Sequence, residues 1–335
     1  MKKRGVGIAV YTLPTGMKGG GDPGQATIKL NPDGTFSLVV GTVDIGQGSN
    51  TILRQIAADT LGVPLEAVAI SNRAADFAPL STGTFASRVT AIDTNAVLMA
   101  VLDLKERMKA FVVNQLEVDP EQLEVADNRI FVRDNPSQGV AMAELGAAVN
   151  WGGHFLVGAG AYQMSPGTGH DPEDGKMTAG GAMSWTTAVA EVEVDTETGE
   201  VDLLKIVHAN EVGVAINPQQ VISQIHGSMA MGIGFALTED SEPYFPSRDF
   251  HSETLGDYFI ASAADMPLEN DAAIVEVRHP TLPVGAKGFS GELGASPAAI
   301  LNAIHDAIGV WVTDYPATPA RILRALETTN GDGQS

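Results

Sequence analysis

The sequence predicts an α+β fold with two lobes, each built from a related hairpin, glycine turn and helix. Strands and helices mix along the 335 residues without strict alternation, which favours this class over a doubly wound sheet. An approximate internal repeat relates residues 26–48 to residues 190–213. The length suffices for two medium cores. We expect a first lobe over residues 1–180, a second over 181–327 and a disordered tail over 328–335.

Each copy of the repeat reads as a β-hairpin followed by a helix. Apolar residues alternate before and after a turn that contains Gly34 in one copy and Gly199 in the other, a pattern typical of hairpins. Both hairpins end in the order acid, aliphatic residue, glycine, at residues 44–46 and 211–213. The helices that follow are expected over residues 49–61 and 219–237.

The remaining elements fit around the two copies. We expect helices over 91–115 and 296–308, a strand over 272–278, and a loop with short strands over 116–133. Residues 152–181, rich in glycine and polar residues, are expected to form a lobe boundary or a long excursion over a partner.

Composition limits the classes of function. Forty-one acidic against 20 basic residues give a formal charge of −21, which argues against binding nucleic acid or a membrane surface. The absence of cysteine excludes disulfides, a cysteine nucleophile, thiolate zinc and an iron–sulfur cluster held by this chain alone. The apolar run at residues 5–11 is too short for a secretory signal, and no stretch approaches the ~20 apolar residues of a membrane span. We expect a cytoplasmic protein.

Conventional catalytic signatures are missing from the sequence, and the seven histidines lack the spacing of metal ligands. Three glycine-rich segments, each leading into a predicted helix, carry the remaining signals. The first, residues 41–49, lets backbone amides approach a ligand, places Gln47 between two glycines, and offers a helix start that favours anionic groups. An ordinary tight turn is the alternative interpretation.

The second segment, residues 81–90, gathers hydroxyls, small residues and Arg88 at a helix start. It could hold a phosphate or a polar ring, or merely cap the helix. The third segment, residues 285–295, places Glu292 among small and apolar residues. Burial would raise the pKa of that carboxyl and make it a better general base, whereas a solvated loop acid is the alternative. Gln224 is a polar residue on an otherwise apolar helix, so it could serve a ligand or a neighbouring turn.

The order of five motifs makes the signal specific. The sequence contains DIGQGSNT, GTFASRVT, NEVGVAINPQQVISQIHGSMAMGIGFALTE, DYFIASAADMP and GAKGFSGELGASPAAILNAI, in that order. It resembles the second half of the molybdenum-binding subunit in the xanthine dehydrogenase and aldehyde oxidoreductase family of molybdenum hydroxylases. The first half of that subunit is missing, so the chain is similar to the medium molybdopterin subunit of nicotinate dehydrogenase.

The resemblance implies a molybdenum–pterin dinucleotide, expected to carry cytosine, held between this chain and a partner. It implies that Gln47 lies near the apical oxo group of the metal without ligating it, and that Glu292 is the catalytic glutamate. The implied cofactor-binding residues are Gly46, Gln47, Gly48, Ala86, Ser87, Arg88, Val89, Thr90, Gln224 and Gly291. Arg88 stands where a smaller residue is expected, and it could pair with a cofactor phosphate or a substrate carboxylate.

The implied activity is hydroxylation of a carbon beside nitrogen in a nicotinate-like or purine-like heteroaromatic substrate, with water as the oxygen source. The implied partners are a first-half molybdopterin subunit, an iron–sulfur subunit with [2Fe-2S] clusters, and a flavin subunit with FAD, since this chain cannot hold a cysteine-ligated cluster. Three alternatives stay open: aldehyde or carbon monoxide oxidation on the same scaffold, a non-catalytic cofactor-binding or assembly subunit, and an acidic α+β binding module.

Overall fold

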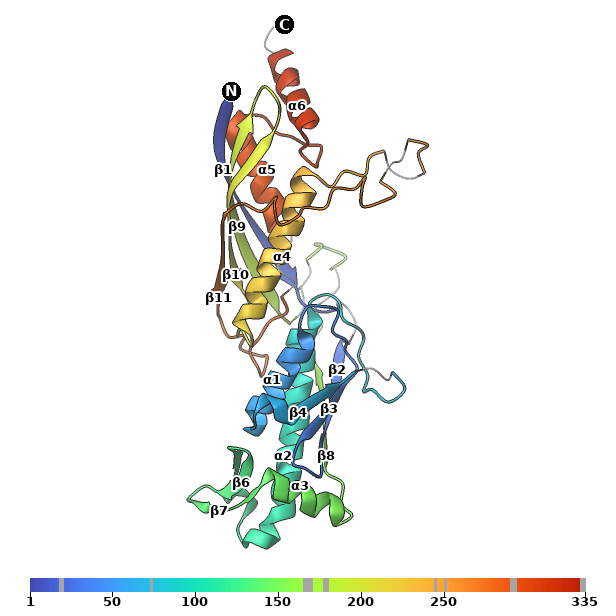
Figure 1. Cartoon of the computed structure of the whole chain (residues 1–335), viewed down its shortest axis with the longest axis vertical. Helices are drawn as coiled ribbons and strands as arrows, with labels where there is room; N and C mark the ends of the chain where they lie inside the picture. Colours follow the sequence, from blue (N-terminus) through green and yellow to red (C-terminus); the bar gives the residue numbers. More distant parts are fainter. Residues whose placement is uncertain are drawn as a thin grey trace. The chain divides into compact units, whose positions relative to one another are not determined.

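The computed structural model describes residues 1–17, 21–72, 75–164, 171–176, 181–243, 246–249, 252–289 and 294–331. Its mixture of helices and small sheets confirms the predicted α+β class. The chain forms two compact units (Figure 1). Unit 1 comprises Met1–Leu13, Ser184–Val277 and Phe289–Ser335, and unit 2 comprises Pro14–Met183 and Arg278–Gly288. The predicted lobes over 1–180 and 181–327 stay a prediction.

Unit 1 is a four-stranded sheet covered on one face by two helices (Figure 1). The strands, in spatial order, are β1 (Lys2–Pro14), β9 (Met183–Asp195), β10 (Val201–Glu211) and β11 (Glu269–Val275). Helices α4 (Pro218–Leu237) and α5 (Ala295–Ile308) supply the other half of the core, and α6 (Pro319–Gly331) follows. The core is built from Ala, Val and Ile because the sheet and helices interleave small and branched side chains.

Unit 2 repeats the design with a second four-stranded sheet. Its strands, in spatial order, are β8 (Val157–Gln163), β2 (Pro23–Leu30), β3 (Phe36–Val40) and β4 (Val68–Ser71). Its two main helices are α1 (Ser49–Leu61) and α2 (Thr94–Leu116), and a π-helical turn, η2 (Val89–Asp93), leads into α2. These elements share one apolar core.

Shorter elements complete unit 2. A three-stranded sheet consists of β5 (Leu123–Ala126), β6 (Arg129–Val132) and β7 (Asn135–Ala141), and α3 (Met142–Trp151) follows it. Two 3₁₀ turns, η1 (Leu65–Ala67) and η3 (Pro120–Gln122), precede β4 and β5. Within the described residues, no helix has both the length and the apolar character needed to cross a bilayer.

The predicted repeat is confirmed by the strand registers. β2 and β3 pair antiparallel and close with Leu30 opposite Phe36, while β9 and β10 pair antiparallel and close with Val194 opposite Val201. The glycines in the two turns, Gly34 and Gly199, both have positive φ, as their turns require. The repeat also extends further than the sequence predicts, because β4 pairs parallel to β3 just as β11 pairs parallel to β10.

The edge strand of each sheet packs against a helix through glycine. A Cβ on Gly160 of β8 would lie 2.2 Å from the Ala100 nitrogen and 2.3 Å from the Ala96 oxygen of α2. A Cβ on Gly5 of β1 would meet Ala307 and Ala303 of α5 in the same way. The absence of side chains at these positions therefore lets strand and helix backbones touch.

Two segments that the sequence treats as irregular are strands for this reason. Residues 5–11, considered above only as an apolar run behind basic residues, lie in β1. Part of the glycine-rich stretch 152–181 is β8, the edge strand of the unit 2 sheet, and the prediction of a lobe boundary or an excursion over a partner in this stretch stays a prediction. In both cases, alternation of small and large residues replaces the usual alternation of apolar and polar ones.

The helices are close to those predicted. Helix α1 has the predicted bounds, and α2, α4 and α5 begin or end within a few residues of theirs. Strand β11 begins and ends slightly before the predicted strand over 272–278. Helix α6 runs to residue 331, so part of the segment predicted as a disordered tail, 328–335, is helical, and residues 332–335 lie outside the described residues.

We predict that Gly160→Ala lowers the stability of unit 2, because the added methyl group would overlap the backbone of α2. Overpacking of this kind costs about 1–3 kcal/mol. Gly227→Ala is the matched control, since nothing lies within 4 Å of a Cβ at that helical position and alanine favours helix. Urea unfolding of both variants measures the difference, and equal midpoints for the two would contradict the packing described here.

Candidate functional site

The first glycine-rich segment is a tight turn between β3 and α1. Gly46 and Gly48 have φ of 108° and 85°, which permits the reversal of the chain. Asp44 fills its centre: its carboxylate accepts hydrogen bonds from the backbone N–H groups of Gly46, Gly48 and Asn50 at 2.9, 3.3 and 3.0 Å. The amides predicted to face an anionic ligand at this helix start are therefore taken by the chain's own carboxylate.

The electrostatics of this turn follow from those bonds. Partial burial opposes ionisation of Asp44, but the three backbone donors outweigh it and lower the pKa of the carboxyl. Gln47, half-buried, folds back on the same turn: its Oε1 accepts from the Ile45 N–H at 2.7 Å. A role of Gln47 toward a metal group stays a prediction.

The second segment lies against the first. Thr84 joins them, because its hydroxyl donates to the Val43 carbonyl at 2.7 Å and lies 3.1 Å from the Thr42 hydroxyl. The loop then passes through Ala86 and Ser87, two consecutive residues with φ of 47° and 52°. Positive φ is uncommon outside glycine, and it turns successive backbone groups of the loop in one direction.

The side chain of Arg88 points into the protein, where it is completely buried. Its guanidinium forms ion pairs with Asp22 at 2.7 Å and Asp93 at 2.9 Å. It also donates to the carbonyls of Pro23 and Gly83 and to the Ser81 hydroxyl. The idea that this guanidinium pairs with a phosphate or a substrate carboxylate is therefore wrong for the structure described here, because its charge is already met by two aspartates.

The third segment meets the second within unit 2. A Cβ on Gly288 would lie 1.9 Å from the Ser87 carbonyl oxygen, so the two backbones are in direct contact. The Val284 N–H donates to Asn95 Oδ1 of α2 at 2.8 Å, and Lys287 donates to the Met183 carbonyl at 2.9 Å. The structure thus brings together residues 42–48, 81–90 and 282–288, which are far apart in the sequence.

Other predicted site residues are placed as follows. Val89 is buried at the start of η2, and the carbonyl of half-buried Thr90 accepts a hydrogen bond from the Thr94 hydroxyl. Gln224 is half-buried on α4 in unit 1, where its amide makes no hydrogen bond to another described residue. Gly291 and Glu292 lie outside the described residues.

Several orphaned polar atoms lie beside the loop. Among the described residues, the buried hydroxyls of Ser87 and Thr15 have no hydrogen-bond partner. Thr15 is also close to Gly288, since a Cβ there would lie 2.8 Å from the Thr15 methyl group. Buried groups of this kind require an explanation, and a ligand or water that bonds to them is one. Hydroxyls, amides and carbonyls suit a polar heterocycle such as a pterin.

The same donor set does not suit a bare metal ion. The described residues hold no group of three or more His, Asp or Glu side chains able to bind one. Asp22 and Asp93 are engaged with Arg88. A metal at this place would therefore depend on ligands carried by the cofactor rather than by this part of the chain.

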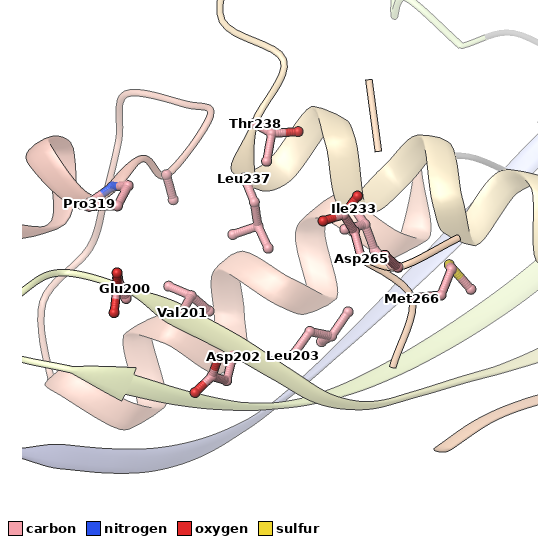
Figure 2. Close-up of a pocket in the computed structure, with 12 residues that line it drawn as sticks. Glu200, Val201, Asp202, Leu203, Ile233, Leu237, Thr238, Asp265, Met266 and Pro319 are labelled. Atoms are coloured by element: carbon pink, nitrogen blue, oxygen red, sulfur yellow. The ribbon is translucent and has the colours of Figure 1, made fainter. Parts of the chain in front are cut away.

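A cavity of about 560 Å³ lies elsewhere, in unit 1 (Figure 2). It opens between the β9–β10 turn, the end of α4 and residues 264–266. Apolar side chains such as Leu203, Ile233 and Met266 share it with Glu200 and Asp202. Of the predicted site residues that the structure describes, none lines this cavity.

Comparisons with known proteins decide the family. Residues 1–267 match the molybdopterin cofactor-binding domain. The chain belongs to that family. It is 32% identical over 312 residues to the aldehyde oxidoreductase molybdenum-binding subunit PaoC of Escherichia coli O157:H7, covering 90% of this chain and 38% of PaoC. It is 28% identical over 345 residues to the nicotine 6-hydroxylase large subunit of Paenarthrobacter nicotinovorans, covering 97% and 41%.

Solved structures agree. Quinoline 2-oxidoreductase from Pseudomonas putida 86 matches with a TM-score of 0.83 and 28% identity, covering 97% of this chain and 42% of that one. Carbon monoxide dehydrogenase from Oligotropha carboxidovorans, at 23% identity and a TM-score of 0.84, shares the fold. The molybdopterin cofactor-binding protein described here is thus homologous to parts of molybdenum hydroxylase subunits, and it spans less than half the length of these relatives.

The sequence misses three residues that shape this site. Asp22, Asp93 and Thr84 hold the loop that carries Ala86 and Ser87, yet none was singled out. The signal available for Asp93 was its position directly after Ala91 and Ile92, at the start of a predicted helix. A buried carboxylate needs a cation, and Arg88 lies five residues away in the sequence.

We predict that Asp44→Ala destabilises the turn before α1, because three backbone N–H groups lose their acceptor. Loss of a side-chain cap costs about 0.5–2 kcal/mol. Since the folded-state pKa is lowered, this stabilisation is present above the unfolded pKa and lost as the pH falls through the folded value. Urea unfolding at pH 7 and at pH 3 measures it. A difference between wild type and variant that does not shrink in acid would contradict the assignment.

Proposed function

We propose that this chain is the molybdopterin-binding part of a multi-subunit molybdenum hydroxylase acting on N-heteroaromatic substrates. The reaction adds oxygen from water to a carbon beside a ring nitrogen: R–H + H₂O gives R–OH, two protons and two electrons. The observation that carries the proposal is the family match over residues 1–267. The meeting of the three loops and the orphaned hydroxyls beside them support it.

The cofactor in this proposal is a molybdenum–pterin cytosine dinucleotide, which supplies the two-electron redox chemistry when bound. Residues 86–90 would hold the pterin through backbone groups, and Gln47 would lie close to the metal. Gln224 and the glycines at 46, 48 and 291 are further cofactor-binding residues in this proposal. The apposed backbones of Gly288 and Ser87 give the loop the rigidity that orientation of a planar ring needs.

Glu292 is the proposed general base. It follows the segment 282–288 that is anchored to α2 and to Ser87, so its loop starts from a fixed point. Its carboxylate takes up the proton that leaves water as the new carbon–oxygen bond forms. A site closed to bulk water would keep that proton transfer directed.

Electrons have to leave through other subunits. The chain contains no cysteine and so offers no ligand set for a cysteine-held cluster. We propose [2Fe-2S] clusters on an iron–sulfur subunit and FAD on a flavin subunit as the acceptors. One relative, the 6-hydroxypseudooxynicotine dehydrogenase complex subunit gamma of Paenarthrobacter nicotinovorans, is itself a subunit of a complex.

A large apolar sheet face supports a further partner. In unit 1 the face turned away from α4 and α5 exposes a row of apolar side chains, which we call the outer sheet face: Val6, Ile8, Val10, Trp185, Val189 and Val275. Several exposed apolar side chains on one sheet face favour an interface there. The proposed occupant is the remaining part of the molybdopterin-binding subunit, since more than half the length of the relatives has no counterpart here.

The substrate class is the least constrained part of the proposal. The nicotine 6-hydroxylase and quinoline 2-oxidoreductase relatives favour an N-heteroaromatic ring. The relative of similar identity that is an aldehyde oxidoreductase subunit favours an aldehyde as the second candidate. Turnover of the assembled complex on a panel of pyridine carboxylates, purines and aldehydes separates the two.

We predict that Glu292→Gln lowers the rate of substrate hydroxylation by about 10²–10⁴-fold, the usual contribution of a general base. Molybdenum and pterin content of the purified complex should stay at the wild-type level, because the amide preserves shape. Glu121→Gln, an exposed acid of η3, is the control and should turn over normally. Wild-type turnover by Glu292→Gln with cofactor retained would defeat the catalytic assignment, and a wild-type complex without molybdenum would defeat the proposed function.

We also predict that Ile8→Lys weakens assembly with the rest of the subunit, because it places a charge in the outer sheet face. Ile8 is 60% exposed, so the chain itself should fold. Leu255→Lys, at a 78% exposed position outside that sheet, is the control. Co-expression with the remaining polypeptide of the subunit, followed by size-exclusion chromatography, measures the complex. An equal yield of complex from the two variants would remove the outer sheet face as the interface.

A further inference from the structure

The loop that carries Ala86 and Ser87 has a backbone shape that these residues do not adopt by themselves. Both are non-glycine residues with φ near +50°, and they follow each other directly. Such conformations persist only where the surrounding structure holds them, and they concentrate at binding and catalytic sites. Contacts with the surrounding structure therefore have to hold the backbone of Ala86 and Ser87.

Arg88 is the next residue, and it is the largest completely buried side chain of the protein's described part. Its Nε donates to Asp22 Oδ1 at 2.7 Å, and its Nη1 donates to Asp93 Oδ2 at 2.9 Å. Its Nη2 donates to the Pro23 carbonyl at 2.8 Å, and Nη1 also reaches the Gly83 carbonyl at 3.1 Å. One guanidinium thus joins the segment before β2, the loop itself and the turn before α2.

Asp22 extends these contacts to the other side of the loop. Besides Arg88, it accepts from the Met17 N–H and the Thr82 hydroxyl, each at 2.9 Å. The Gly16 N–H, next to Met17, donates to the Ala86 carbonyl at 2.8 Å. The two residues with positive φ therefore lie between a hydrogen bond to Gly16 and the buried side chain of Arg88.

The charges of this cluster also indicate a fixed arrangement. In this buried cluster, two carboxylates face one guanidinium. Burial is the main cause that raises the pKa of Asp93 to about 7. The charge of Asp22 adds to this rise in pKa, and the charge of Arg88 opposes it. Asp93 Oδ1 has no partner among the described residues, and a Cβ on Gly24 would lie 2.6 Å from it. Glycine at position 24 is therefore what allows the carboxyl to fit.

We propose that the side chains of Arg88, Asp22 and Asp93, here called the Arg88 cluster, position the 84–90 loop for the pterin without themselves touching it. Arg88 is then a positioning residue: it fixes the direction of the Ala86 and Ser87 backbone groups before any ligand arrives. This inference rests on the proposed function, in which that loop binds the cofactor. Only a fork of fixed geometry can meet both carboxylates and two carbonyls at once, so lysine cannot replace it.

The test uses the full chain and compares Arg88→Met with Arg107→Met, the same change at an exposed, ion-paired position of α2. Hydrogen exchange of the cofactor-free chain is measured first. In Arg88→Met, amides of residues 84–90 should exchange at least tenfold faster while unit 1 is unchanged, and Arg107→Met should match wild type. Arg88→Lys should restore little of the protection.

Molybdenum content of the assembled complex is measured second. Arg88→Met should lose most of its molybdenum, whereas Arg107→Met should load fully. Wild-type exchange of the loop amides in Arg88→Met would overturn the inference. Full loading of Arg88→Met with molybdenum despite a lower unfolding midpoint would also overturn it, because the cluster would then serve stability alone. If Arg88→Met does not yield folded protein, Asp93→Asn is tested in its place, because this variant keeps the Arg88–Asp22 pair. Wild-type exchange of the amides of residues 84–90 in Asp93→Asn would overturn the inference.

The two arms separate this inference from the proposed function. The exchange arm needs no cofactor and decides whether the Arg88 cluster holds the loop. A wild-type complex without molybdenum would refute the proposed function and, with it, the positioning role. Molybdenum in the wild type together with full loading of Arg88→Met would refute the positioning role alone.

Discussion

Direct contact between backbones, made possible by glycine, is the constraint on which the rest of the molecule depends. Gly160 lets β8 touch α2, Gly5 lets β1 touch α5, and Gly288 lets the third loop touch Ser87. A Cβ at any of these positions would fall within 2.4 Å of a backbone atom. Such contacts tolerate almost no adjustment, so they set the spacing of strand, helix and loop more tightly than side-chain packing could. A loop built this way is rigid before a ligand binds.

The same constraint explains what could be predicted from the sequence. Hairpins 26–40 and 190–211 and helices α1, α2, α4 and α5 follow from period-2 and period-3.6 patterns, which report burial of one face. Strands β1 and β8 were not predicted, because glycines lie on their buried face and glycine in a sequence indicates a turn more often than a strand. The sequence therefore predicts the hairpins of the repeat but not its edge strands.

The local features of the site could be predicted from the sequence, whereas its long-range contacts could not. The three glycine-rich loops were recognisable because small residues and helix starts are local features, and within unit 2 the structure brings together the first two and residues 285–288 of the third. The fate of Arg88 was not recognisable, since it depends on Asp22, 66 residues distant in sequence. An arginine in a polar loop is typical of a ligand-binding site, and the sequence does not show that buried aspartates pair with it. Glu292 remains a prediction from the motif, as it lies outside the described residues.

The internal repeat gives the two loops before α2 and α5 comparable places in the fold. Each follows a strand that pairs parallel to a hairpin, and each leads into a helix packed on a glycine-bearing edge strand. Divergence of the two copies has made them chemically different. The loop before α2 carries Arg88, whose charge is neutralised by Asp22 and Asp93, whereas the sequence before α5 contains Lys287 and Glu292. In the proposed function, the loop before α2 holds a polar ring in place and Glu292 accepts a proton.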